Sequence, residues 1–199
     1  MIVKRLFDLV VVIPSIVVFI PLFFLIGIVI KLDSNGPVFF RQIRVGKSGK
    51  EFSIFKFRTM IVDAEAKGLQ ISTSTDSRIT KTGAVLRKYK LDELPQLINV
   101  FFGQMSLVGP RPEVPKYVAC YPIDIKDKIL SMQPGITDLA SIEFSNENEM
   151  LENLDNAEKE YIENILPIKF KYYLNYVDKH SLVGDLKIIA MTIFKIIRH

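Results

Sequence analysis

The first thirty residues contain the longest apolar run of the chain. Between Lys4-Arg5 and Lys31 the sequence reads LFDLVVVIPSIVVFIPLFFLIGIVI, and its uncharged part, Leu9 to Ile30, is 22 residues long. A helix of about 20 apolar residues crosses the hydrocarbon core of a bilayer. The run exceeds the apolar region of a usual signal peptide, and no small-x-small cleavage site follows it. The pattern therefore predicts a retained membrane helix.

The topology of this helix has two equal alternatives. Basic residues flank both of its ends, and the positive-inside rule then favours both ends in the cytoplasm, as in a re-entrant hairpin. Pro21, near the middle, removes a helical hydrogen bond and could turn the helix back. Re-entrant segments are uncommon, because backbone groups freed at the bend need protein partners. Charge and proline alone do not decide between a hairpin bent at Pro21 and a kinked span.

Beyond residue 32 the pattern predicts one α+β domain that is mainly helical. Alternation over Val38 to Val45 and then Phe52 to Phe57, with Gly46 to Gly49 between them, predicts a β-hairpin. Helical spacing or composition follows over Ala84 to about Leu94, Pro95 to near Gly103, Tyr117 to Met132 and the acidic part from Glu147 to Asn164, and QPGIT marks a turn.

The last helix is amphipathic. Lys187, Lys195 and Arg198 lie on one side, and Leu186, Ile189, Ile193 and Ile196 lie on another. Such a stripe suits either core packing, the commoner case, or a helix lying on a bilayer.

Charge is distributed unevenly along the chain. The net charge is +4, but Arg41 to Lys90 has twelve basic residues against four acidic ones, whereas Glu143 to Glu163 has eight acidic residues and one lysine. The basic part should face an anionic partner, either a bilayer surface or a phosphate-rich substrate. Nucleic acid is not expected, because no binding motif accompanies the charge. We interpret the acidic part as a solvated helix face.

Cysteine and histidine exclude several kinds of site. Cys120 is the only cysteine, so an internal disulfide and a multi-thiolate metal site are excluded. The two histidines, His180 and His199, lie too near the end of the sequence to suggest a zinc site. A reducing, cytoplasmic setting fits this composition.

Two adjacent carboxylates, Asp92 and Glu93, stand out in KLDELPQL. Consecutive helical residues point about 100° apart, so their roles should differ. Pro95 disfavours a helical Leu94, which predicts a junction just before the helix that Pro95 opens, where exposed N–H groups keep a carboxylate ionised. Helix capping is the ordinary explanation of such acids. An ionised carboxylate could instead bind Mg²⁺ or attack phosphorus.

Four arginines favour the chemical interpretation. Arg87 lies one helical turn before the acidic pair, Arg58 ends the hairpin, Arg78 lies in DSRIT, and Arg111 stands between two prolines. Prolines on both sides restrict the backbone, so the Arg111 guanidinium loses less entropy on binding a phosphate.

Together, KRLFDL, GPVFFRQIRVGKSGKEFSIFKFRTM, DSRITKTGAVLRKYKLDELPQLINVFFGQMSLVGPRP and QPGIT resemble the bacterial sugar transferases known as monotopic phosphoglycosyl transferases. The resemblance covers about residues 4–137. No four-helix membrane bundle precedes it, so the small form of the family is expected. The resemblance favours the hairpin, with residues 1–32 as a re-entrant membrane anchor bent at Pro21. Residues 33–199 would form a catalytic domain with interfacial helices, on the cytoplasmic face of the bacterial inner membrane.

The family's reaction gives these residues roles. The resemblance implies transfer of a sugar 1-phosphate from a UDP-sugar to polyprenyl phosphate, with release of UMP, as the first membrane step of glycan synthesis. Asp92 would be the nucleophile and a Mg²⁺ ligand, and Glu93 would be the neighbouring acid/base. Arg111, Arg58, Arg78 and Arg87 would bind phosphates. Downstream glycosyltransferases or a second copy of the chain are candidate partners.

Two departures from the family pattern are visible. Ile20 replaces the usual serine before Pro21, so a hydroxyl that helps the bend would have to come from elsewhere, for example from Ser15. After PGIT, Asp138 and the sequence LASIEFSNENE replace the usual Gly and the following Gln-Val-x-Gly-Arg run. If this loop touches the sugar or the nucleotide, the donor is unusual.

Two functions of other classes compete with the enzyme. One is a non-catalytic membrane scaffold for a glycan pathway, against which the retention of both acids and Arg111 argues. The other is a basic, amphipathic module that binds lipid or nucleic acid, for which steep salt sensitivity would be expected.

Overall fold

The computed structural model describes residues 2–64, 76–152, 154 and 156–198. It is mainly helical, as predicted. The helices are α1 (Ile2–Asp33), α2 (Lys81–Lys88), α3 (Gln96–Phe101), α4 (Pro115–Val118), α5 (Ile123–Ile129), α6 (Leu139–Glu143), α7 (Glu147–Met150), α8 (Ala157–Glu160), α9 (Leu166–Lys179) and α10 (Leu182–Ile197), with short turns η1 (Lys47–Gly49), η3 (Leu91–Glu93) and η4 (Tyr161–Ile165). The strands are β1 (Phe39–Val45), β2 (Glu51–Phe57), β3 (Ser106–Val108) and β4 (Gly135–Thr137).

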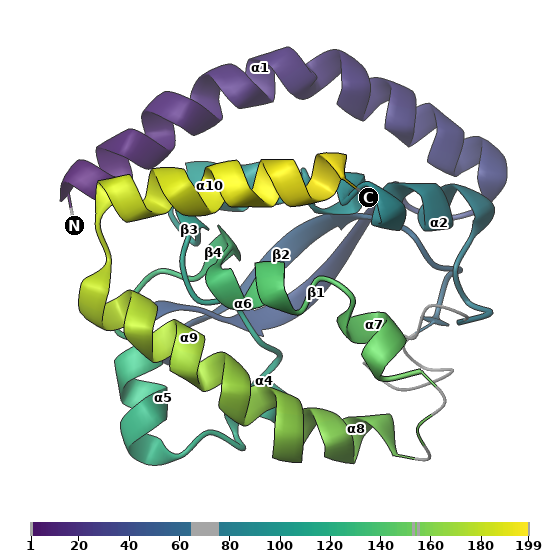
Figure 1. Cartoon of the computed structure of the whole chain (residues 1–199). Helices are drawn as coiled ribbons and strands as arrows, with labels where there is room; N and C mark the ends of the chain where they lie inside the picture. The colour runs from purple at the N-terminus through teal and green to yellow at the C-terminus, as the bar shows by residue number, and fades with distance from the viewer. Residues whose placement is uncertain (1, 65–75, 153, 155, 199) are drawn as a thin grey trace.

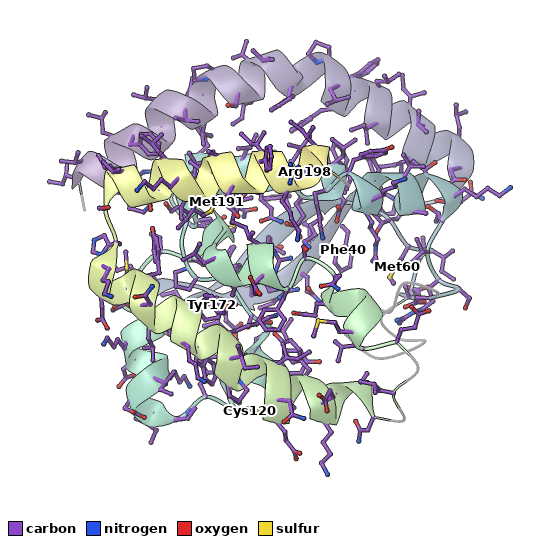
Figure 2. All side chains as sticks on the ribbon, viewed as in Figure 1. Phe40, Met60, Cys120, Tyr172, Met191 and Arg198 are labelled. Carbon is purple, nitrogen blue, oxygen red and sulfur yellow. The ribbon has the colours of Figure 1, made fainter. Side chains whose placement is uncertain are left out.

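Helix α1 is one continuous helix that arches over the body of the protein, with α10 directly beneath it (Figure 1). It is the only helix in the described ranges that is long and apolar enough to cross a membrane. Only 11% of its most apolar window is buried, so it is not a core helix. Many of its side chains project outward from the arch (Figure 2), while Asp8, Val12, Ile26 and Ile30 are buried against the body. The membrane prediction is thus supported by composition and exposure, and the re-entrant topology stays a prediction.

The two prolines of α1 are accommodated within this arch. The Ser15 hydroxyl donates to the Val11 carbonyl at 2.7 Å, a bond to the preceding turn that tends to bend a helix. The carbonyl that Pro21 leaves free belongs to Val17, four residues earlier. Ser15 therefore does not supply the hydroxyl bond that we expected for a bend at Pro21.

The β-hairpin is confirmed, with β1 and β2 antiparallel from Phe39 opposite Phe57 to Val45 opposite Glu51. The sequence did not predict the second sheet, in which β3 and β4 pair in parallel. Each of these strands has three residues, which is too short to show a period of two.

Two helix predictions need correction. Helix α2 ends at Lys88 rather than near Leu94. The segment expected as one helix from Tyr117 to Met132 is two short helices, because Pro122 cannot continue the bonding of α4.

The core forms three clusters of buried apolar side chains. One lies between α4, α5, η4 and α9, a second joins the first half of α1 to β2, α3, β3 and α10, and a third joins the second half of α1 to β2 and α2. The acidic part contributes Leu151, Ala157 and Tyr161 to the first cluster, so its apolar side is buried, while Glu163 and Asn164 are exposed as expected for a solvated face.

The core-packing interpretation of the last helix holds for only part of α10. Ile188 is buried and Ile189 packs against the second cluster, but Leu186 and Ile193 are 54% and 53% exposed. The exposed apolar face of α10 leaves its outer side available for a bilayer.

Candidate active site

A sharp corner presents the two acids. After α2 the chain turns through Lys90, whose φ of +55° is left-handed and uncommon for a residue other than glycine. Asp92 and Glu93 follow in η3, just before α3. The predicted junction is therefore confirmed.

The conformation that we expected for Leu94 is wrong. It is helical, with φ −54° and ψ −35°. The Leu91 carbonyl already accepts from the Leu94 N–H at 3.2 Å, so the N–H that Pro95 lacks leaves no acceptor unpaired.

Asn99 fixes the acidic corner against the hairpin. Its side chain is fully buried in α3, accepts from the Phe55 N–H at 2.9 Å and donates to the Ser53 carbonyl at 2.8 Å. These bonds join α3 to the backbone of β2. They bring the residues just before α3 close to the end of β2, where Lys56 lies.

Glu93 lies between two cations. Its Oε1 accepts from Lys56 Nζ at 2.7 Å and from Arg111 Nη2 at 2.6 Å, and Arg111 Nη1 is 3.4 Å from Oε2. Burial would raise the pKa of Glu93, but Arg111 and Lys56 outweigh it and hold that pKa well below its usual range. Glu93 in turn raises the pKa of Arg111, whereas burial lowers the pKa of Lys56. Lys56 therefore holds its proton less tightly than Arg111 does.

Asp92 is in a different environment. It is 8% exposed, and within the described ranges no hydrogen bond or ion pair to its carboxylate is found. Burial raises its pKa and the neighbouring Glu93 adds to this, while Lys56 and Arg87 pull the pKa down. We expected the start of the helix to favour the ionised form, but burial dominates instead. The two acids thus have different surroundings, in line with the prediction that their roles differ.

The loop that carries Arg111 is held on both sides. Gly109 N–H donates to Thr137 O at 3.1 Å, and Gly135 N–H donates to Pro110 O at 3.0 Å. A Cβ on Gly135 would lie 2.1 Å from Gly109 N, so the two backbones meet where only glycine fits. The contact joins the SLVGPRP and QPGIT segments.

The other side of this loop rests on β1. Arg44 Nη1 donates to the Pro112 carbonyl at 2.9 Å and lies 3.5 Å from the buried Glu113 carboxylate. Tyr161 donates to Glu113 at 2.5 Å, and its hydroxyl accepts from Lys169 Nζ at 3.3 Å. Tyr161, in the acidic part, therefore belongs to a buried polar network behind Arg111.

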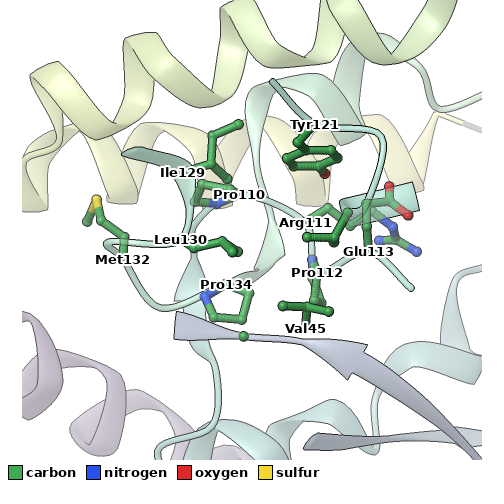
Figure 3. Close-up of a pocket in the computed structure, with 12 residues that line it drawn as sticks. Val45, Pro110, Arg111, Pro112, Glu113, Tyr121, Ile129, Leu130, Met132 and Pro134 are labelled. Atoms are coloured by element: carbon green, nitrogen blue, oxygen red, sulfur yellow. The ribbon is translucent and has the colours of Figure 1, made fainter. Parts of the chain in front are cut away.

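A cavity of about 10 Å³ lies behind the Pro-Arg-Pro loop, bounded by Pro110, Pro112, Pro134 and Tyr121 (Figure 3). That is about the space of one water molecule. It is far too small for a nucleotide sugar, so it belongs to the packing of the loop and not to a substrate site.

The structure brings together only some of the predicted arginines. Arg111 contacts Glu93, and Arg87, whose Nε donates to the Thr59 hydroxyl at 2.9 Å, interacts electrostatically with Asp92. Arg78 bonds Asp76 at 2.6 Å, and burial together with the charge of Arg78 lowers the pKa of Arg87. Arg58 is directed away from the acids and donates to the Ser34 and Asn35 carbonyls at 2.6 and 2.7 Å. These bonds hold the chain just after α1. They do not support a phosphate-binding role for Arg58, which stays a prediction.

Two residues of the site were missed. Lys56 shares a strand face with the buried Phe52 and Ile54, and a lysine at a core-facing position of an alternating strand was the available signal. Gln96 opens α3, is 1% exposed, and its Nε2 has no hydrogen-bond partner in the part of the chain that the structure describes. Nothing in the sequence pattern distinguished Gln96.

Asp138, one of the departures noted in the sequence, has a structural role. It is 2% exposed, caps α6 and accepts from the Ser141 N–H and hydroxyl at 3.0 and 2.6 Å. These bonds hold the carboxylate within the fold.

The described residues contain no cluster of three or more His, Cys, Asp or Glu side chains that could hold a metal ion. A metal with several protein ligands therefore does not fit. Mg²⁺ commonly binds through one or two carboxylates together with substrate phosphates, and the unpartnered Asp92 carboxylate fits that arrangement.

Comparison with known proteins gives a consistent result. A family model described as bacterial sugar transferase matches residues 1–199. A UDP-glucose:undecaprenyl-phosphate glucose-1-phosphate transferase of Klebsiella pneumoniae is 39% identical over 199 residues, which are 98% of this chain and 40% of that protein. The uncharacterized sugar transferase EpsL of Bacillus subtilis is 38% identical over 197 residues, 99% of this chain and 88% of EpsL.

A third relative acts on a different sugar. The UDP-N-acetylgalactosamine-undecaprenyl-phosphate N-acetylgalactosaminephosphotransferase of Aeromonas hydrophila is 41% identical over 142 residues, 70% of this chain and 34% of that protein. The chain thus spans about two fifths of the Klebsiella relative and a third of the Aeromonas relative.

Proposed function

Because the chain belongs to the bacterial sugar transferase family, we propose that it transfers a sugar 1-phosphate from a UDP-sugar to a polyprenyl phosphate. Undecaprenyl phosphate is the acceptor named for several relatives, whose donors include UDP-glucose and UDP-N-acetylgalactosamine. The reaction would release UMP and begin the assembly of a glycan on the membrane.

One observation carries this proposal: the buried Asp92 and the partly buried Glu93, surrounded by Lys56, Arg87 and Arg111. A carboxylate that attacks a diphosphate is repelled by it, and fixed cations offset both that repulsion and the charge on the leaving phosphate. The closeness of the acids to the cations supports such a reaction.

The reaction divides into two displacements at one phosphorus atom. An oxygen of Asp92 attacks the phosphorus that bears the sugar, the bond from that phosphorus to the oxygen of UMP breaks, and UMP leaves with the electron pair. An oxygen of the polyprenyl phosphate then attacks the aspartyl phosphosugar and Asp92 leaves as a carboxylate. Glu93 is a weak base while Lys56 and Arg111 hold it, so it would accept a proton of the lipid phosphate in the second step once the substrate phosphates draw these cations away.

The cations have separate tasks. Arg111 and Arg87 bind phosphate oxygens, and Lys56 holds Glu93 in place and compensates charge beside Asp92. Asp92 would share Mg²⁺ with the diphosphate, and the ion would withdraw negative charge from the phosphate oxygens.

Helix α1 is tied to the body of the protein at both ends, which supports the re-entrant topology. Near its start, Arg5 donates to the Val100 and Phe101 carbonyls at 2.5 and 2.8 Å. At its end, Asp33 accepts from the Thr82 N–H at 2.9 Å. A helix that crossed the bilayer would have its two ends on opposite faces, about 30 Å apart. The body of the protein, on one face, could not then hold both ends. We therefore propose a monotopic protein whose catalytic domain lies on the cytoplasmic face of the inner membrane.

The test is UMP release by the purified full chain in detergent with undecaprenyl phosphate, Mg²⁺ and a panel of UDP-sugars. One donor should give turnover, and mass spectrometry of the quenched enzyme should find a phosphosugar on Asp92. Asp92→Asn should lower UMP release at least about 10³-fold and abolish the adduct. Binding of UDP-sugars without turnover would favour the scaffold alternative, and an active Asp92→Asn enzyme would refute the assigned nucleophile.

A further inference from the structure

The first two turns of α1 contain Lys4, Arg5 and Asp8 in an otherwise apolar helix. Asp8 is 2% exposed and bonds strand β3: its Oδ2 accepts from the Ser106 hydroxyl at 2.9 Å, and its Oδ1 accepts from the Leu107 N–H at 3.2 Å. No ion pair to Asp8 is found in the described ranges, so these bonds are what offsets the burial of its charge.

A second buried contact holds the same strand from α9. The Tyr176 hydroxyl lies 3.0 Å from the Val108 carbonyl and 2.8 Å from Asp185 Oδ1, so its single hydrogen is shared between two acceptors. Asp185 Oδ2 accepts from Lys4 Nζ at 2.5 Å. The start of α1 therefore reaches β3 twice, directly through Asp8 and indirectly through Lys4, Asp185 and Tyr176.

Strand β3 leads straight into the loop that carries Arg111. Val108 is three residues before Arg111, and the loop between them is bonded to β4 through Gly109 and Pro110. A shift of β3 would therefore move the Arg111 guanidinium relative to Glu93, which lies on a separate element.

We propose that Asp8 and Tyr176 are positioning residues for the transfer reaction, and that they act by holding β3 so that Arg111 faces the acidic pair. The expected change in UMP release rests on the proposed function, whereas the expected change in the structure of β3 and its loop does not. It assigns to the head of the membrane helix a part in the active site, beyond anchoring the protein.

The first experiment measures amide hydrogen exchange in the full chain. Asp8→Asn replaces the charged carboxylate by a neutral amide, so the bonds to the Leu107 N–H and the Ser106 hydroxyl both lose their charge assistance, and exchange over residues 106–113 should become about tenfold faster. Asp33→Asn is the matched control, because it weakens a contact at the other end of α1 that does not involve β3. Unchanged exchange over residues 106–113 in Asp8→Asn would overturn the proposal.

The second experiment is a double-mutant cycle on UMP release. Asp8→Asn should lower the rate about tenfold in the native background, but less than about twofold when Arg111 is already replaced by Met, because both changes then remove the same contribution. If Asp8 had a merely structural role, Asp8→Asn would lower the rate of UMP release by the same factor in the native and the Arg111→Met backgrounds. Asp33→Asn should act independently of Arg111→Met.

Tyr176→Phe provides a second variant should Asp8→Asn fail to fold. It removes only the hydroxyl, and we expect the same faster exchange and the same coupling to Arg111→Met. The positioning role would be refuted if Asp8→Asn and Tyr176→Phe each lowered the rate of UMP release by the same factor with and without Arg111→Met. A native enzyme that releases no UMP would refute the proposed function instead, and the exchange experiment would still decide the role of Asp8.

Discussion

At the scale of residues, the two adjacent acids receive different shares of the surrounding positive charge. Glu93 takes the direct bonds of Lys56 and Arg111, so it stays ionised, whereas Asp92 is buried with no bonded partner among the residues that the structure describes, and its pKa is raised. A nucleophile with no competing partner is free to approach phosphorus. The neighbour that is fixed by two cations is suited to holding its position while substrates exchange.

Glu93→Gln should separate the two steps. The change removes a negative charge beside Asp92 and frees Lys56, and both effects lower the pKa of Asp92. Because Asp92 must be ionised to attack, the acid limb of the pre-steady-state UMP burst should move to lower pH. Steady-state turnover should fall about 10²-fold or more, since the second step loses its acid/base.

Rapid-quench measurements of UMP across pH test this expectation. Glu51→Gln, at an exposed position at the start of β2, is the control and should change neither the burst nor the turnover. If the acid limb of the UMP burst moved to higher pH in Glu93→Gln, the proposed effect of Glu93 on the pKa of Asp92 would be contradicted.

The sequence predicted the acids and Arg111 because each stands in a distinctive local setting: a helix junction and a pair of prolines. It did not predict the contacts of Arg58, since an arginine bonded to the Ser34 and Asn35 carbonyls has the same local pattern as one that awaits a phosphate. Whether an arginine binds carbonyls or a phosphate depends on which residues the fold brings near it, and local spacing carries no such information.

At the scale of elements, the hairpin was predictable because its strands alternate and a turn separates them, whereas the β3–β4 pair was not. The pair depends on a backbone contact between Gly109 and Gly135. A single sequence contains the two glycines but not their distance of closest approach.

Gly135→Ala should therefore disrupt the Arg111 loop. The new Cβ would lie 2.1 Å from Gly109 N, so one of the two strands must shift. We expect a loss of at least about 3 kcal/mol of unfolding free energy together with loss of UMP release. Chemical denaturation of the full chain in detergent measures the first quantity.

Gly27→Ala in α1 is the matched control for this substitution. Its Cβ would meet Val38 at 3.5 Å, an ordinary contact, and alanine favours a helix over glycine. Stability should stay the same or rise slightly. Equal losses at the two glycines would show that the close approach of β3 and β4 is not responsible.

At the scale of the whole molecule, α1 and α10 lie at one end and the acidic part with α7 and α8 lies at the other (Figure 1). An anionic membrane would repel the acidic end and attract basic residues near the apolar one. The distribution of charge therefore favours a single orientation of the protein on the bilayer.

Both ends of α1 should be reachable from one side of the membrane. Ile2 and Leu32 are 86% and 83% exposed, so cysteines placed there, with Cys120 replaced by serine, should react with an impermeant maleimide. We expect both Ile2→Cys and Leu32→Cys to react in inside-out vesicles and neither to react in intact spheroplasts. Labelling of one position from each side would establish a membrane-crossing helix.

The exposed face of α10 should contact lipid. The chain has no tryptophan, so Ile193→Trp gives a single fluorophore on this face, which is 53% exposed at that position. Brominated acyl chains should quench its emission in reconstituted vesicles. Ile123→Trp, on α5 and 80% exposed, is the control and should not be quenched. Equal quenching at both positions would contradict the proposed orientation.

The bond between Lys4 and Asp185 joins residues 181 positions apart, so it also sets an order for biosynthesis. Lys4 precedes Asp185 by 181 positions, so it leaves the ribosome long before Asp185 has been translated. On the proposed membrane topology, the apolar helix would therefore meet the bilayer before its contact with Asp185 exists. A nascent chain stalled before residue 185 would then be membrane-bound but would lack the contacts of Asp185 with Lys4 and Tyr176.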